Sequence, residues 1–158
     1  MATSRVPAAV AALLNILRAA PDLNDPDSPV RIVDGPSAVN FSERDIIYVG
    51  WQPSGESAVS IQQTFNGAGA RTRDEDFVIA GYIESRAGDK DASLRRDRVF
   101  EMLGVIEMEL RASNTFPEAP TLNGTVQWAH LTAGDLHQEQ KDGSLAGLNF
   151  SVSCFARI

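Results

Sequence analysis

The side chains that most often do chemistry are scarce in this 158-residue sequence. It has two histidines, His130 and His137, seven residues apart. Neither belongs to an H-x-x-x-H or C-x-x-C pair, and zinc needs three or four converging ligands, so no metal site is predicted. We expect His130 to pack beside Trp128 and His137 to lie in a solvated turn.

Cys154 is the only cysteine, so no internal disulfide can form, and the chain suits a reducing compartment. It falls on the apolar side of an alternating run, where a small buried hydrophobe is expected rather than a nucleophile. No G-x-S-x-G occurs, and the glycine-bearing "NGAGAR" lacks the Lys-Ser/Thr of a phosphate loop. These patterns predict no catalytic residue and no cofactor.

Acidic side chains are the one remaining material for an enzyme. If they converged at one end of a sheet, their oxygens could hold a divalent cation, as in a small metal-dependent hydrolase. The acid-rich "RDED" before an apolar strand is also typical of a solvated segment that prevents edge pairing, and we favour this second interpretation. The residues concerned are Asp34, Asp45, Asp74, Glu75, Asp76 and Glu84.

The order of elements that must position these residues is one helix, four strands, a second helix and two strands. Apolar spacing predicts helices over residues 5–19, with Thr3 or Ser4 as N-cap, and 91–113, capped by Asp91. On the second helix we expect the side opposite the apolar stripe to be solvated, with Arg95, Arg98, Glu101 and Glu109. Strands are predicted over residues 30–33, 45–51, 58–65, 77–88, 125–140 and 145–158, with a glycine-rich loop at 66–76 and a tight turn at Asp142-Gly143. Short connections favour an antiparallel meander for the first strands.

This order predicts a single α+β domain over residues 1–158, with a mostly antiparallel sheet and both helices packed on one face. A hydrophobic content of 43% with 22% charged residues is typical of a folded domain. The longest apolar window, about 15 residues, is too short to span a bilayer. The net charge of -7 argues against a nucleic-acid grip on phosphates.

Three stretches together resemble the tail terminator and head-tail joining proteins of long-tailed bacteriophages. They are "VRIVDGPS" followed by "RDIIYVGW"; "GARTRDEDFVIAGYIESRAGDKD" leading into "RRDRVFEMLGVIEMELR"; and the ending "GTVQWAHLTAGDLHQEQKDGSLAGLNFSVSCFARI". The resemblance is one of layout and short motifs, and it covers nearly the whole chain.

The resemblance implies a protein that is not an enzyme and needs no cofactor. It implies a homo-oligomer, commonly a hexameric ring, that ends tail-tube growth and joins the tail to the head. The implied partners are the tail tube protein and the head-tail connector proteins. The implied location is the virion tail or neck, after assembly in the host cytoplasm. A neck, head-completion or minor tail protein of the same particle is the alternative.

DNA would only pass through the lumen of such a ring. Six copies, each at -7, carry about -42 together, and such a charge lets DNA pass without sticking.

The resemblance also suggests where the subunits meet. In the loop at residues 66–76 and at its end, the candidate contacts with the tube or a neighbour are Arg71, Arg73, Asp74, Glu75 and Asp76. On the last strand they are Phe155 and Arg157. We expect this strand to lie at a sheet edge and to pair with the next subunit, because an edge strand has unpaired backbone groups. A central strand would instead favour a role for Phe155 and Arg157 in covering the sheet.

Overall fold

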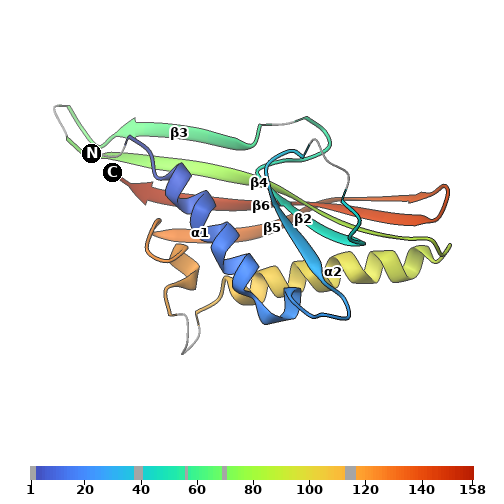
Figure 1. Ribbon diagram of the computed structural model, residues 1–158. Coiled ribbons are helices and arrows are strands. Elements are labelled where there is room, and N and C mark those ends of the chain that lie inside the picture. Colours follow the sequence, from blue (N-terminus) through green and yellow to red (C-terminus); the bar gives the residue numbers. More distant parts are fainter. Residues whose placement is uncertain (1–2, 38–40, 56, 69–70, 113–116) are drawn as a thin grey trace.

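The computed structural model describes residues 3–37, 41–55, 57–68, 71–112 and 117–158, and it confirms the α+β fold (Figure 1). Two helices and a six-stranded sheet follow one another in the predicted order. The elements are α1 (Val6–Ala19), the 3-10 turn η1 (Pro21–Leu23), β1 (Val30–Asp34), β2 (Asp45–Val49), β3 (Val59–Phe65), β4 (Arg73–Ala87), α2 (Ala92–Glu109), the 3-10 turn η2 (Ala119–Thr121), β5 (Trp128–Gln140) and β6 (Ser144–Arg157).

The sheet has the order β1-β2-β4-β6-β5, and β3 pairs with β4 in line with β2. All neighbours are antiparallel except β1 and β2, which are parallel, so the meander predicted for the first strands is wrong at that point. A parallel pair requires the chain to run back to the level of the start of β1 before β2 begins, and residues 35–44 provide this connection. β4 begins at Arg73, so the predicted loop at 66–76 ends earlier than expected.

The last strand is central rather than at an edge, which corrects the prediction for β6. It pairs with β4 on one side and with β5 on the other, so that Phe155 lies between Asp76 and Trp128. The tight turn with Asp142 at φ 57° joins β5 to β6 as predicted, but β5 takes the outer position. The exposed margins of the sheet are therefore β1, β3 and β5.

Both helices cover the same face of the sheet, as predicted (Figure 1). In α1 the buried stripe includes Leu13 and Leu17, and in α2 it includes Met102 and Ile106. Asp91 caps α2 by accepting a hydrogen bond from the Leu94 N–H at 3.2 Å, which confirms that cap. The N-cap position of α1 is Arg5 rather than Thr3 or Ser4, although Ser4 Oγ accepts a hydrogen bond from the Val6 N–H at 3.1 Å.

Among the described residues, no helix is long and apolar enough to cross a membrane.

Candidate interaction surfaces

The acidic segment expected to contact a partner forms the start of β4. Arg71 and Asp76 are exposed, and Asp74 is half-buried. Asp74 accepts hydrogen bonds from Arg157 at 2.7 Å and 3.3 Å. The hydrogen bond from Arg157 lowers the pKa of Asp74, and the same bond raises the pKa of Arg157. The structure thus brings together two of the predicted contact residues that are 83 residues apart in the sequence.

Two other residues of that segment point into the protein. Glu75 is fully buried, and its carboxylate accepts hydrogen bonds from the Arg5 N–H at 2.8 Å and from the Gln63 amide. The Arg73 guanidinium donates to the carbonyl of Thr3 at 2.8 Å. Both side chains therefore hold the backbone of the residues just before α1. Because Glu75 is buried, a partner cannot reach it, and we remove it from the candidate interface.

Phe155 belongs to a row of rings on the face away from the helices. Its ring centroid lies 5.9 Å from that of Trp128, which in turn lies 4.5 Å from that of His130. This confirms that His130 packs beside Trp128. His137 lies on β5 rather than in a turn, and its imidazole contacts Glu139 at 2.9 Å.

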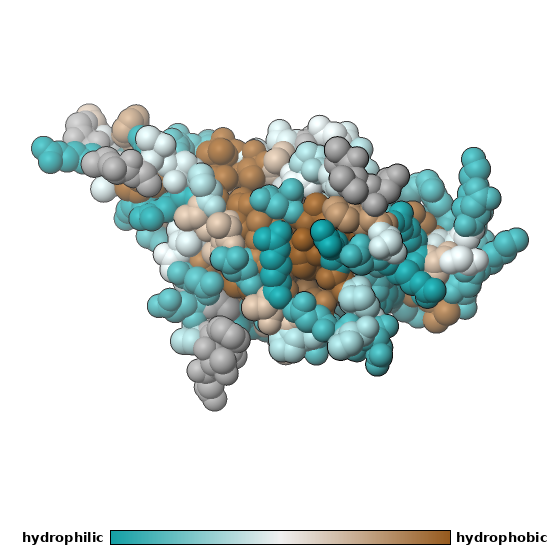
Figure 2. Space-filling model, in the orientation of Figure 1, coloured by the Kyte–Doolittle hydropathy of each residue, from teal (hydrophilic) through white to brown (hydrophobic). Residues whose placement is uncertain are grey.

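The two outer strands β3 and β5 expose apolar side chains. On β3 the exposed fraction is 51% for Ile61 and 71% for Phe65, and on β5 Trp128 and Leu136 are also exposed. Figure 2 shows apolar surface reaching the margin where β3 lies, whereas the end formed by the β5–β6 hairpin is mostly hydrophilic. Sequence analysis missed these β3 residues, although seven consecutive uncharged residues in a strand were a usable signal.

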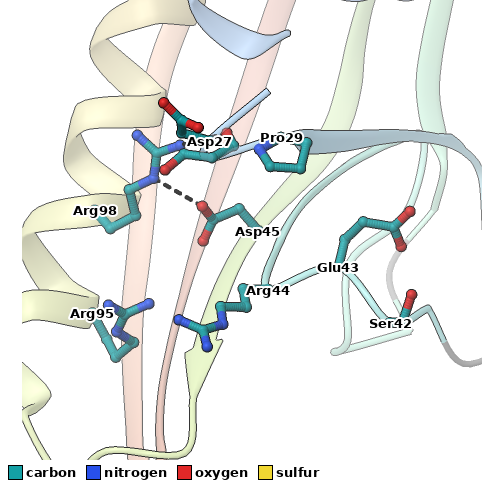
Figure 3. A pocket seen from close by; sticks show the side chains of 9 residues that line it. Asp27, Pro29, Ser42, Glu43, Arg44, Asp45, Arg95 and Arg98 are labelled. Atoms are coloured by element: carbon teal, nitrogen blue, oxygen red, sulfur yellow. Dashed lines mark hydrogen bonds and ion pairs between the residues drawn. The ribbon is translucent and has the colours of Figure 1, made fainter. Parts of the chain in front are cut away.

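A group of charged side chains lies where β2 begins beside α2 (Figure 3). Asp45 is buried and accepts hydrogen bonds from Ser85 Oγ at 2.7 Å and from Arg98 Nε at 2.9 Å. Arg95 donates to Ser85 Oγ at 3.0 Å. Arg95 and Arg98 were expected on the solvated side of the helix, and this is wrong, since both are half-buried against β2 and β4.

Burial lowers the pKa of Arg98, but the hydrogen bond and charge of Asp45 outweigh burial, so the net pKa of Arg98 is raised. The arginine therefore stays charged and neutralises the buried aspartate. Asp45 and Arg98 are 53 residues apart in the sequence, so no local pattern indicates this contact.

The six carboxylates that could have formed a metal site do not converge. Asp74, Glu75 and Asp76 lie at the start of β4, Asp45 and Glu84 lie near its other end, and Asp34 ends β1. In the part of the chain that the structure describes, no three His, Cys, Asp or Glu side chains could hold a metal ion together. Cys154 is buried, as predicted, and burial raises the pKa of its thiol to about 12.

No known protein-family model matches this sequence, and no curated protein is significantly similar to it.

Proposed function

We propose that this chain is a non-enzymatic assembly protein of a long-tailed phage particle, which forms a ring at the end of the tail tube, stops tube growth and joins the tail to the head connector. A neck, head-completion or minor tail position in the same particle is the alternative within this proposal. The observation that supports it best is the pair of open strand edges on opposite margins of one sheet, at β3, which has no charged residue, and at the first half of β5.

Natural sheets normally protect such edges with charges or proline. β3 has neither over its seven residues, and the first seven residues of β5, 128–134, contain no proline, acid, lysine or arginine. The sequence places its charged residues elsewhere, including at the other end of β5. Two unprotected edges on one subunit fit a contact between copies of the chain.

Strand direction determines which assembly this contact allows. β3 and β5 run in opposite directions, because three antiparallel pairings separate them. A rotation about an axis parallel to the strands keeps all strand directions, so the β3 of one subunit would meet the β5 of the next in antiparallel pairing. Such a contact joins two different surfaces, and it closes into a ring when the rotation divides a full turn.

The outward-facing backbone of β3 can be identified from its bonds to β4. Ala58 accepts from the Ala80 N–H, and the Asn66 N–H donates to Thr72. Bonds of an antiparallel pair fall on alternate residues, so the N–H of Ile61 points away from β4. Ile61→Pro would remove that donor without breaking a bond to β4, and Ile61→Ala keeps it.

Native mass measurement and electron microscopy of purified protein, with and without phage tail tubes, test the proposal. We expect closed rings or tube-bound oligomers for the native chain and for Ile61→Ala, and monomers for Ile61→Pro with an unchanged circular dichroism spectrum. A protein that stays monomeric at every concentration and never associates with tubes would remove the proposal. A two-fold dimer would contradict the β3-to-β5 contact.

A further inference from the structure

Three arginines line a hollow of about 470 Å³ between the start of β2 and α2 (Figure 3). They are Arg44, Arg95 and Arg98, in a chain whose net charge is -7. Among the residues that the structure describes, only Arg98 of the three forms an ion pair inside the hollow. We propose that the hollow is an oxyanion-binding site, in which Arg44 and Arg95 bind a carboxylate or phosphate group.

The charge of Arg98 is already matched. Its Nε donates to Asp45 Oδ2 at 2.9 Å, and its Nη1 lies 3.0 Å from Glu101. Both oxygens of Asp45 are engaged, since the other one, Oδ1, accepts a hydrogen bond from Ser85 at 2.7 Å. The buried aspartate and Arg98 thus form a neutral unit that shapes one wall of the hollow.

Arg95 has a guanidinium that is only partly satisfied. Its Nη1 donates a hydrogen bond to Ser85 Oγ, and that hydroxyl donates in turn to Asp45. The Arg95 Nε, in contrast, is buried with no hydrogen-bond partner in the part of the chain described. A buried donor without a partner costs about 1–3 kcal/mol. An oxyanion in the hollow would accept hydrogen bonds from the Arg95 guanidinium, and charge-assisted bonds from guanidinium to oxygen are among the strongest in proteins.

Arg44 extends from the loop before β2 into the same hollow, on the side of Arg95 (Figure 3). Asp89 is influenced by the charges of both arginines, but its carboxylate is hydrogen-bonded to Ser144 Oγ and to the Asp91 N–H. Glu43, next to Arg44, pairs with Arg31 at 3.5 Å instead. Two guanidiniums therefore share one hollow without a carboxylate between them among the described residues, which is the arrangement that a small anion fits.

The arrangement of acidic and basic side chains around the hollow favours a single oxyanion rather than a polyanion. Asp27 and Glu43 also line the hollow, and they would repel a chain of phosphates. One carboxylate or one phosphate can reach the arginines between these acids, and Ser42 adds a hydroxyl donor to the lining. The group can come from an acidic side chain of a partner protein or from free phosphate, and both present oxygens that arginine binds in a bidentate way.

Isothermal titration of the full chain with inorganic phosphate and, separately, with glutarate tests the site at constant ionic strength. We expect at least one of them to bind with a millimolar dissociation constant or better, and Arg95→Gln and Arg44→Gln to weaken it by about tenfold or more. Arg96→Gln is the matched control, because Arg96 is the next residue of α2, is exposed and does not line the hollow. Thermal unfolding of each variant verifies the fold.

Tighter binding of glutarate would assign the site to an acidic side chain, and tighter binding of phosphate would assign it to the free ion. No binding of either below about 10 mM would overturn the proposal, and so would an equal loss in Arg96→Gln and Arg95→Gln. The measurement needs only the folded subunit, so failure of ring assembly and failure of this site are separate results.

Discussion

The two halves of β4 share one strand partner, β6, yet have different surroundings on the other side. Residues 73–79 pair with the exposed strand β3, and residues 81–85 pair with β2. On the face away from the helices, Val78 is 38% exposed, but Tyr82, four residues later, is only 6% exposed because Trp51 and Tyr48 pack on its ring at 5.8 Å and 6.0 Å. The aromatic residues of β2 and of the segment directly after it, rather than β4 itself, therefore decide which half of β4 is covered.

This difference teaches where the protein can change without unfolding. In the sealed half, residues on both sides of the strand are packed, so a change in volume or charge has no room to relax. In the open half, one face and the edge of β3 remain at the surface, and substitutions there should act on association instead. Substitutions matched between the halves test this difference.

The largest expected effect is that of Gly81→Ala in the sealed half. A Cβ at this position would lie 2.1 Å from Cζ of Phe150, a ring that is completely buried. Overpacking of this kind forces side chains and backbone to shift, and we expect a loss of about 3 kcal/mol in the free energy of unfolding. Urea denaturation followed by fluorescence measures it.

Two substitutions serve as controls for Gly81→Ala. Gly104→Ala places a Cβ on α2 with no described atom within 4 Å beyond the neighbouring residues and the backbone of the helix itself, and it should stabilise the protein by up to about 1 kcal/mol. Phe65→Ala removes a large ring from the open half, but this ring is mostly exposed, so the change should stay within about 0.5 kcal/mol. A loss for Phe65→Ala as large as that for Gly81→Ala would contradict the distinction between the halves.

The next effect compares two Asp–Arg ion pairs, one near each end of β4. Asp45→Asn leaves the half-buried Arg98 with only the exposed Glu101 as a counter-charge, and we expect a loss of about 2 kcal/mol in the free energy of unfolding. Asp74→Asn breaks the exposed pair with Arg157, which water and salt screen, so its loss should be clearly smaller. The same urea titrations are repeated in about 0.5 M salt, which screens exposed charges more strongly than buried ones. The added salt should reduce the stability loss of Asp74→Asn more than that of Asp45→Asn.

Much of the fold could be predicted because its signals are local. The alternation along β6, the Asp142-Gly143 turn and the Asp91 cap each depend on neighbouring residues, and the structure confirms all three. The order of strands in the sheet is not local. Nothing in the residues of β6 distinguishes a central from an edge position, because either position allows one buried and one polar face.

The candidate surfaces were harder to predict, because they depend on which segments fold onto the sheet. The acids at the start of β4 read as one charged surface in the sequence, yet Glu75 turns inward to hold the start of α1. Arg95 and Arg98 are expected on the solvated side of the helix, yet Arg95 donates to Ser85 and Arg98 pairs with Asp45, which is 53 residues away in the chain. Polar residues that pair over such separations leave no periodic pattern, so periodicity could not reveal them.

The smallest expected effect is a difference in pH dependence between two carboxyls of β4. Burial raises the pKa of Glu84 and outweighs the opposite influence of Arg86 and the Tyr82 hydroxyl, whereas the hydrogen bond from Arg157 lowers the pKa of Asp74. A carboxyl whose pKa is raised in the folded state contributes stability at pH values below its unfolded-state pKa of 4.5. This contribution is lost as the pH rises through the folded-state pKa. A lowered one contributes stability above the unfolded-state value of 3.8, and this is lost as the pH falls.

The stabilities of the two neutral variants, each relative to the native chain, should therefore change with pH in opposite directions. Relative to native, Glu84→Gln should gain stability as the pH rises from 4 to 7, because it no longer holds a charge in a half-buried position. Asp74→Asn should lose stability, relative to native, as the pH rises through the acid range. Urea denaturation at several pH values between 3 and 7 measures both, and slopes of the same sign would contradict the contrast between a sealed and an open half of β4.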